Sequence, residues 1–238
     1  MAANPNFEFF GFLSSPPKHD FFSDFCYHIF IILNASTTSP HVEMERAWLT
    51  LKLAHIREQQ NRINDAATVL QDLQVETFGS MDRIEKVEFI LEQMRLCLAN
   101  KDIIRAQIIS KKISTRFFTD KKDDEAVQKL KLKFYRLMSV LKSEEEEYLN
   151  VANFYNHMLD TGLIQANDKQ RIKATKAVLL NCLLAVHGPD QVSLLNKTHD
   201  CGTIEDDLPQ YKRLAKIFLD SEIIEWLPFC EMYSLVGK

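Results

Sequence analysis

The chain has almost no glycine or proline through its central part. No proline occurs from His41 to His187, and the only glycines in that span are Gly79 and Gly162. The hairpins of a β protein need residues that accept a positive φ, so a turn-rich β fold cannot be built from this stretch. Helix interiors need neither residue type. The sequence therefore predicts an all-α fold from about residue 42 onward.

Composition limits the kinds of function. The chain of 238 residues has room for one large domain or two small ones, and its 46% hydrophobic residues are ordinary for a globular protein. A formal net charge of −4 argues against nucleic-acid binding driven by overall basicity. The five cysteines have no repeated spacing and form no CxxC pair. That usage favours reduced thiols over a zinc site or a disulfide framework.

The segment from Ser80 to Ala99 predicts a helix that is apolar on two sides. One stripe at helical spacing consists of Ile84, Val87, Leu91, Met94 and Leu98. Phe89 and Leu96 fall roughly opposite that stripe, which leaves a narrow sector for charged residues. An interior helix in a stack of helical hairpins touches its own partner and a neighbouring hairpin. We therefore expect both sides of this helix to be buried.

A weak internal repeat supports such a stack. Asp65-Ala66-Ala67 with Val69 and Leu70 resembles Ile104-Arg105-Ala106 with Ile108 and Ile109, at an offset of 39 residues. The small alanine is expected where two helices approach closely, and the branched residues are expected to fill the layer behind it. The sequence thus predicts a degenerate α-solenoid of TPR-like helical hairpins.

Capping residues predict several helix ends. We expect Ser80 to cap the two-sided helix, with Asp82 in its first turn. Asn100 is expected to take the left-handed conformation after that helix. Ser143 and Glu146 have the spacing of a capping box, which predicts a new helix from this point. Gly162 is expected to end it.

A search for chemical motifs identifies no catalytic, cofactor-binding or metal-ligating residue, and we predict no cofactor. The seven histidines are scattered, and the sequence holds no HExxH, GxSxG, P-loop or GxGxxG pattern. His199-Asp200-Cys201 is the one cluster that fits a nucleophile. We interpret it as a polar loop, because adjacent residues rarely converge on one reacting atom.

Two charged stretches have a structural and a functional interpretation. Glu144 to Glu147 have the composition of a metal or basic-partner site, and we interpret them as a solvated helix start. The stretch KLKLKFYR at 129–136 mixes basic and aromatic residues, as nucleic-acid binders do. On a helix, Leu130, Phe134, Leu137 and Leu141 form a core stripe. We therefore interpret the lysines of this stretch as the solvated side of a core helix.

Several long blocks resemble one protein family. They are VEMERAWLTLKLAHIREQQ, LQVETFGSM, VEFILEQMRLCLA and QIISKKI, with a looser continuation in KLKLKFYRLM and YKRLAKIFLDSEIIEW. These blocks are similar to the family of the non-ATPase regulatory subunit 12 of the 26S proteasome, a component of the regulatory-particle lid. The resemblance covers about residues 42–230 and is most specific from 74 to 113.

The resemblance implies a right-handed α-solenoid arm in a non-catalytic scaffold subunit of the lid. Such a subunit would support lid assembly and ATP-dependent degradation of ubiquitinated proteins in the cytoplasm and nucleus. Its implied partners are other lid subunits, the ATPase base and the core particle, with no nucleic acid, membrane or small-molecule ligand. The alternatives are a solenoid arm of a related PCI complex, such as the signalosome or a translation initiation factor, and a small cysteine hydrolase that uses Cys201 and His199.

The same resemblance divides the chain into three parts. Residues 42–230 would be the solenoid arm, and residues 231–238 a truncated C-terminus, with the PCI winged-helix module of the family absent. Residues 1–41 hold eight phenylalanines and are predicted to be poorly ordered or loosely packed. Their apolar run FCYHIFIIL is too short to cross a bilayer, and the flanking residues do not favour a signal peptide.

Overall fold

The computed structural model describes residues 43–120, 124–201 and 208–220, together with residues 223, 225, 226, 229 and 230. Within these residues the regular structure is helical and no strand is present, which confirms the all-α prediction. The right-handed solenoid stays a prediction, and the segments 1–41 and 231–238 lie outside the described residues. The chain forms two compact units, Met1–Asp102 and Ile103–Lys238. None of the described helices combines the length and the apolar character that a membrane crossing needs.

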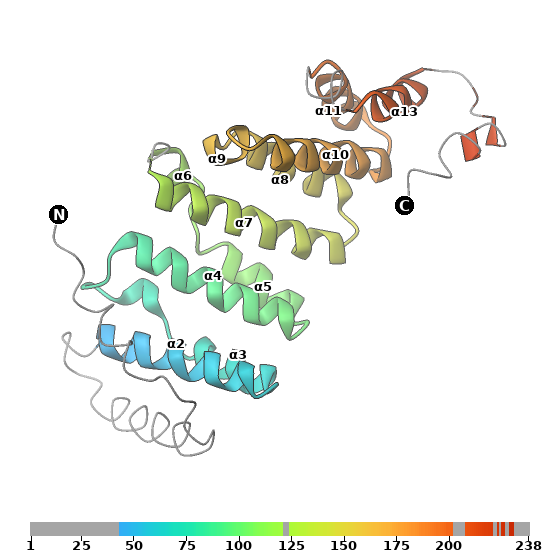
Figure 1. Ribbon diagram of the computed structural model, residues 1–238. Coiled ribbons are helices and arrows are strands. Elements are labelled where there is room, and N and C mark those ends of the chain that lie inside the picture. The colour runs from blue at the N-terminus through green and yellow to red at the C-terminus, as the bar shows by residue number, and fades with distance from the viewer. Residues whose placement is uncertain are drawn as a thin grey trace. The chain divides into compact units, whose positions relative to one another are not determined.

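Among its described residues, from 43 on, the first unit contains three helices and a short 3₁₀ turn (Figure 1). They are α2 (Glu43–Gln59), α3 (Ile63–Gln71), η3 (Val75–Thr77) and α4 (Arg83–Ala99). Helix α3 packs against both α2 and α4, and η3 also contacts α4. The alanines of the predicted repeat lie in this contact region, since Ala66 and Ala67 are almost fully buried.

Helix α4 is buried on two sides, as the sequence predicts. Phe89 exposes 5% of its surface and Leu91 exposes none, although the two residues belong to different stripes. The buried residues of α4 are Val87, Phe89, Ile90, Leu91, Gln93, Met94, Leu96 and Cys97. Such a helix has no wide polar face, which is why its charged residues are confined to a narrow sector.

A buried glutamine joins α4 to the end of α3. The Gln93 side-chain amide donates to the carbonyl oxygens of Leu70 and Leu73, at 2.8 Å in each case. Leu70 lies in the last turn of α3, where its carbonyl also accepts from the Leu73 N–H at 3.3 Å, and Leu73 lies just after the helix. Gln93 is itself buried, so its amide reaches both carbonyls where water cannot. A leucine at this position would leave these acceptors without the amide.

An arginine joins α4 to α2. The Arg95 guanidinium pairs bidentately with the Glu58 carboxylate, at 2.6 and 2.7 Å, and its Nε donates to Glu92 at 2.7 Å. The hydrogen bond from Arg95 holds the pKa of the Glu58 carboxyl below its ordinary value, with burial acting in the opposite direction. A planar guanidinium fixes the relative orientation of the two helices better than an ammonium would.

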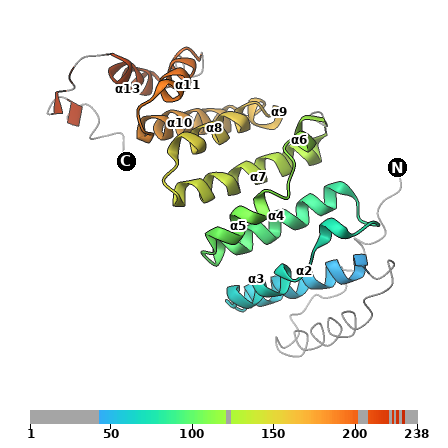
Figure 2. The same cartoon turned by 180° about the vertical axis from the view of Figure 1, so that it is seen from behind.

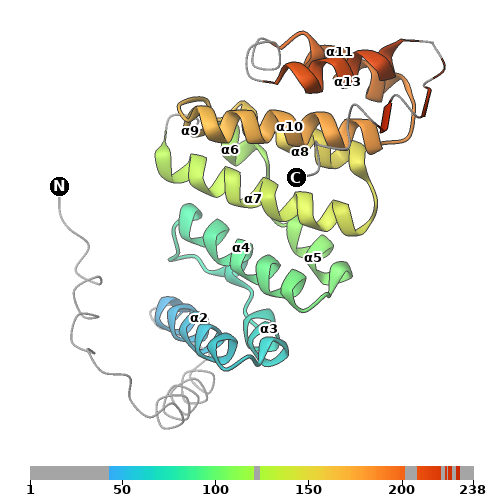
Figure 3. The same cartoon turned by 45° about the vertical axis from the view of Figure 1, so that its right-hand side comes forward.

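The second unit contains eight labelled helices among its described residues. They are α5 (Ile103–Ser110), α6 (Arg116–Asp120), α7 (Glu125–Glu144), α8 (Tyr148–Leu159), α9 (Gly162–Gln165), α10 (Asp168–Leu184), α11 (Pro189–His199) and α13 (Pro209–Leu219). Helix α8 packs against both α7 and α10 (Figure 2). Helix α10 also contacts α11 and α13, which lie side by side (Figure 3).

The far end of this unit has a small core of its own. It combines residues of α8, α10, α11 and α13: Ala152, Leu179, Cys182, Leu194, Leu195, Tyr211, Leu214 and Ala215. Small residues such as Ala152 and Ala215, both fully buried, allow the helices to approach closely. Helix α8 contacts two helices, α7 and α10, but its buried residues Val151, Ala152 and Met158 group on one side, unlike those of α4.

Three helix ends share a motif that the sequence did not predict correctly. Asn61, Lys101 and Glu146 have φ near 60°. The residue after each donates its N–H to the carbonyl five positions earlier, at 2.9 to 3.0 Å, which is the Schellman pattern. The left-handed residue after α4 is therefore Lys101 and not Asn100, whose φ is −81°.

The predicted capping box at Ser143 and Glu146 is wrong. Ser143 lies in the last turn of α7, and Glu146 is the left-handed residue that follows this helix. Helix α8 begins only at Tyr148, with Glu147 at its N-cap. A capping-box pattern predicts a helix start only where no helix precedes it. Here α7 continues through Ser143, so the same residues form a helix end.

Other predicted helix ends shift by a few residues. Asp82 is the N-cap of α4 and accepts from the Ile84 N–H at 3.3 Å, so Ser80 is not the cap. Gly162 begins α9 and does not end α8, which stops at Leu159. There the Gln128 side-chain oxygen accepts from the Leu163 N–H at 3.1 Å.

We predict that Phe89→Ala and Leu91→Ala each lower the free energy of unfolding by about 2 to 5 kcal/mol, because each leaves a cavity in a buried layer. Glu88→Ala, at an exposed position of the same helix, serves as the control and should change stability by less than about 0.5 kcal/mol. Denaturant unfolding of the three variants measures this. A Phe89→Ala protein as stable as the parent would contradict the two-sided burial of α4.

Candidate binding site

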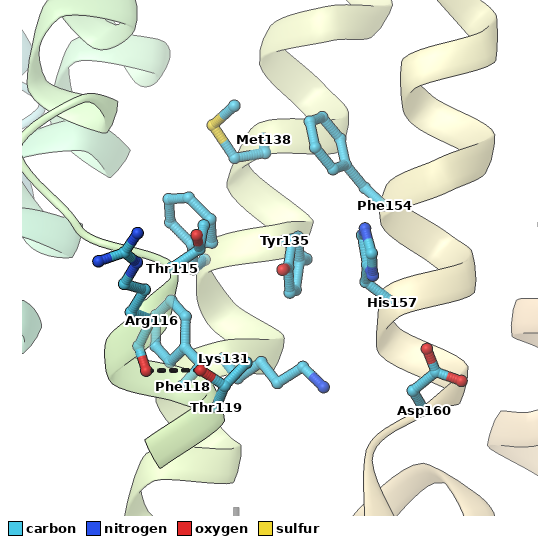
Figure 4. Close-up of a pocket in the computed structure, with 11 residues that line it drawn as sticks. Thr115, Arg116, Phe118, Thr119, Lys131, Tyr135, Met138, Phe154, His157 and Asp160 are labelled. Carbon is cyan, nitrogen blue, oxygen red and sulfur yellow. Dashed lines mark hydrogen bonds between the residues drawn. The ribbon is translucent and has the colours of Figure 1, made fainter. Parts of the chain in front are cut away.

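A hollow with a volume of about 480 Å³ opens among α6, α7 and α8 (Figure 4). Its walls come from the residue before α6, from α6 itself and from one face each of α7 and α8. The lining residues are Thr115, Arg116, Phe118, Thr119, Lys131, Phe134, Tyr135, Met138, Phe154, His157 and Asp160. Hollows of this size are typical of sites that take up side chains or small ligands.

Helical spacing brings the central lining residues together. Lys131, Tyr135 and Met138 follow one another at steps of four and three along α7. Phe154 and His157 lie one turn apart on α8, and Asp160 follows directly at its end. Each set lies on one face of its helix, and the packing of α7 against α8 sets these faces side by side.

The wall of the hollow is a chain of aromatic rings. The Tyr135 ring stacks on the His157 ring at 5.2 Å between centroids, with 23° between the planes. Phe154 lies 5.8 Å from Tyr135 and Phe134 lies 5.3 Å from it. Phe118 packs on Phe134 at 5.4 Å and closes the base from α6. These distances are within the range of favourable ring pairs, so the wall is rigid and largely apolar.

Charged groups surround this aromatic wall. Arg116 and Asp160 lie on opposite sides of it, and Lys131 is close to the ring of Tyr135 (Figure 4). The Thr119 hydroxyl donates to the Arg116 carbonyl at 2.8 Å, which closes the short helix α6. The hollow thus has an apolar centre and a rim that carries both signs of charge.

Burial shifts the pKa values of two lining groups, Tyr135 and His157. Burial raises the pKa of the Tyr135 phenol, and the Asp160 carboxylate raises it further. Burial lowers the pKa of the His157 imidazole below its ordinary value of 6.5; Asp160 opposes this, and the charges of Lys131 and Lys197 add to it. Both groups are therefore held in their neutral forms near neutral pH, which suits stacking.

This arrangement supports binding and not a recognised catalytic mechanism. An aromatic wall with a methionine at its edge has the chemistry to pack on an apolar side chain, because rings and a flexible thioether fit such groups well. Among the residues that the structure describes, no group of three or more histidine, cysteine or acidic residues is placed to hold a metal ion. The perturbed groups, Tyr135 and His157, are stacked on each other and do not form a nucleophile–base pair.

The candidate nucleophile cluster lies away from this hollow, at the end of α11. His199 Nδ1 faces its neighbour Asp200 at 3.1 Å, and the Cys201 side chain is exposed. Cys201 follows the helix as a turn residue, with its N–H donating to the Thr198 carbonyl at 3.2 Å. The geometry places a histidine–carboxylate contact here, but it records no contact between the imidazole and the thiol.

The glutamate run does not have the position that we predicted. Glu144 ends α7, so the run forms the turn after one helix and not a solvated start of the next. Lys142 binds two of its members, with its Nζ at 2.6 Å from Glu145 and 3.0 Å from Glu147. Hydrogen bonds from Glu145 and Glu147 raise the pKa of the Lys142 ammonium against the effect of burial. Two of the four glutamates in this run therefore have a structural role, because their ion pairs with Lys142 stabilise the end of α7.

The basic and aromatic stretch behaves as the core-stripe interpretation predicts. Leu130, Phe134 and Leu141 are buried, and Leu137 is half-buried. Sequence reasoning nevertheless missed the hollow, because it assigned no role to Tyr135, Phe154, His157 or Asp160. The three-residue spacing of Phe154, His157 and Asp160 was a usable signal, since it places a polar histidine and a carboxylate on one face with an aromatic ring.

Comparison with known proteins gives consistent matches. A family model described as PSMD12/CSN4, N-terminal, matches residues 27–167. The 26S proteasome non-ATPase regulatory subunit 12 homolog A of Arabidopsis thaliana is 36% identical over 220 residues, covering 84% of this chain and 50% of that protein. The 26S proteasome non-ATPase regulatory subunit 12 of Dictyostelium discoideum is 35% identical over 191 residues, covering 80% and 42%.

A more distant relative agrees. The 26S proteasome regulatory subunit RPN5 of Saccharomyces cerevisiae is 32% identical over 185 residues, which cover 78% of this chain and 40% of that protein. The chain thus spans between 40% and 50% of the length of these three relatives.

We predict a loss of stability on acidification that depends on His157. Its pKa in the folded chain lies below the ordinary value of 6.5, so the unfolded chain binds the proton more readily. The contribution of His157 to the free energy of unfolding should therefore fall as the pH drops from about 6.5 through the lowered pKa, and level off below it. Denaturant unfolding between pH 7 and the acid limit should show a smaller fall for His157→Gln than for the parent.

Asp160→Asn provides the matched test of the cause. The Asp160 carboxylate raises the pKa of His157, so its removal lowers that pKa further and should enlarge the acid-dependent loss. An identical pH profile for the parent, His157→Gln and Asp160→Asn would show that this imidazole does not change its protonation on unfolding.

Proposed function

The chain belongs to the family described as PSMD12/CSN4, N-terminal, and on this premise we propose that it is a non-catalytic scaffold subunit of the 26S proteasome regulatory-particle lid. Its role would be to support assembly of the lid and thereby ATP-dependent degradation of ubiquitinated proteins. The observation that carries the proposal is the identity of 32% to 36%, over 78% to 84% of this chain, to proteins named as proteasome regulatory subunits.

The proposed partners are the other lid subunits, the ATPase base and the core particle, with no nucleic acid, membrane or small-molecule ligand. An assembly scaffold needs rigid surfaces that accept side chains of neighbouring subunits. The hollow around Tyr135 and Phe154 offers such a surface within the second unit, because its aromatic wall is already ordered by ring contacts. We place the protein in the cytoplasm and nucleus, where its proposed assembly works.

Two alternatives remain open. The family description pairs PSMD12 with CSN4, so the first alternative is a solenoid arm of a related PCI complex such as the signalosome or a translation initiation factor; the names of the relatives favour the proteasome over it. A cysteine hydrolase that uses Cys201 and His199 is the second alternative. A hydrolase needs the imidazole in contact with the thiol, and the structure has the His199 ring against Asp200 and not against Cys201, which argues against this alternative.

We predict that the tagged full chain, expressed in cells and purified by its tag, recovers proteasome lid subunits. Quantitative mass spectrometry should find them enriched at least tenfold over a purification from cells that express the tag alone. Recovery of signalosome or initiation-factor subunits in their place would support the related-complex alternative. Recovery of none of these assemblies by a folded, soluble chain would contradict the scaffold proposal.

The hydrolase alternative is tested by cysteine reactivity. Burial raises the pKa of the Cys182 thiol to about 11, and its Sγ donates to the Gln191 carbonyl at 3.4 Å. At pH 8 roughly one in a thousand Cys182 side chains is a thiolate, so a thiol-reactive probe should label it only after unfolding. Cys201 should react at the rate of an ordinary exposed thiol.

Labelling is assigned to each cysteine by peptide mass spectrometry, with Cys201→Ser as the control that removes one site. A Cys201 rate more than about tenfold above that of a cysteine in a short model peptide would indicate an activated thiol. That result would favour the hydrolase over the non-catalytic scaffold. A rate that falls in His199→Gln would further identify the base.

A further inference from the structure

The hollow among α6, α7 and α8 has a buried floor and an exposed rim. The rings of Phe118, Phe134 and Tyr135 form the floor, and all three residues are buried. The exposed lining residues include Thr115, Arg116, Thr119 and Asp160. A small ligand in such an open depression would leave much of its own surface in water, whereas a protein segment covers the rim together with the floor. The occupant that fits is therefore a side chain carried by a partner protein.

The hollow differs from the exposed apolar residues of α5. Ile104 exposes 73% of its surface and Ile108 exposes 56%. Sequence reasoning expected Ile108 to fill a layer beside Ile109, and this expectation is wrong because only Ile109 is buried. Two exposed isoleucines form an apolar surface, but they do not determine the chemistry of a partner. The hollow joins its rings to charged groups, so it does limit that chemistry.

Among the described residues, Arg116 is a cation on this rim without an anionic partner. Its backbone carbonyl accepts from the Thr119 hydroxyl, and this bond leaves the guanidinium unused. A guanidinium presents its donors in a planar fork that matches the two oxygens of a carboxylate. A carboxylate that a partner brings next to the rings would therefore meet a suitable donor.

A carboxylate on the other side of the hollow gives the occupant a direction. Asp160 lies across the rings from Arg116 (Figure 4), and it is the one acidic residue among the lining residues that the structure describes. Its charge acts on the rings between them, since it raises the pKa of both Tyr135 and His157. An anionic group of a partner is thus attracted at Arg116 and repelled at Asp160. Lys131, the second cation of the lining, attracts the same kind of group.

We propose that the hollow binds an apolar side chain of a neighbouring lid subunit, and that an aspartate or glutamate of the same segment pairs with Arg116. The apolar side chain would lie on the rings of Phe134, Tyr135 and Phe154, with the flexible Met138 at its edge. The carboxylate would form the ion pair that Arg116 lacks, and repulsion on the opposite side sets which way the segment runs. This inference rests on the proposed function, because it takes the partner from the same assembly.

The first test places a crosslinking group in the hollow without filling it. The tagged full chain is expressed in cells that incorporate photo-methionine, a diazirine analogue of similar size, and the cells are illuminated before purification. Peptide mass spectrometry assigns the crosslinks that start from Met138. The dominant one should reach a lid-subunit peptide with an apolar residue and a carboxylate within about four residues of each other, which is the length of one helical turn.

Charge reversal tests the ion pair. Arg116→Glu should lower the yield of this crosslink about tenfold, because two carboxylates then face each other. Arg136→Glu is the matched control, since Arg136 is exposed on α7 and does not line the hollow, and it should leave the yield unchanged. Replacing the carboxylate of the crosslinked peptide by lysine should restore the yield in Arg116→Glu.

A bulky residue on the rim tests the hollow independently of crosslinking. Thr115→Trp should fill it and lower recovery of the crosslinked subunit about tenfold, without lowering the melting temperature. Ser114→Trp, at an exposed position outside the lining, should leave recovery unchanged.

Two failures can be told apart. If the tagged parent recovers no lid subunits, the proposed function and this inference fall together. If it recovers them, this inference alone is overturned by a crosslinked peptide without a nearby carboxylate, by equal yields in Arg116→Glu and Arg136→Glu, or by equal recovery with Thr115→Trp and Ser114→Trp.

Discussion

The structure depends on one constraint, which is that its interior helices must be covered on two sides. Helix α4 has buried residues around most of its circumference, and a helix of this kind exposes too much apolar surface to remain stable alone in water. Neighbouring elements have to cover it, and polar contacts then fix how they do so. Gln93 satisfies the end of α3, and Arg95 holds Glu58 of α2. In the second unit helix α8 likewise contacts two helices, α7 and α10.

The existence of the helices could be predicted from the sequence, whereas their ends could not. The shortage of glycine and proline excludes a turn-rich β fold over long stretches, and this prediction of helices does not depend on any single residue. The position of a helix end depends on which of several nearby polar side chains hydrogen-bonds to the free backbone groups. Asp82, and not Ser80, caps α4. After this helix Lys101 takes the left-handed conformation, which Asn100 would adopt at lower cost. At Glu146, the ion pairs of Lys142 with the neighbouring Glu145 and Glu147 stabilise the left-handed conformation.

The hollow was harder to predict because its residues satisfy the core pattern equally well. Phe134 is a buried member of the α7 stripe and also a wall of the hollow. A periodic stripe states which face of a helix is covered, but not whether its neighbour covers it completely. Whether a gap remains depends on the lengths and positions of α6 and α8, which are set by contacts between distant residues. The position of His157 on an aromatic face was visible in the sequence, but its stacking on Tyr135 was not.

The hollow of the second unit would recognise a protein by shape more than by net charge. Its rim has charges of both signs, so net charge gives little selection there, and shape and ring contacts dominate. An aromatic wall that is already ordered then rejects partners whose side chains do not fit.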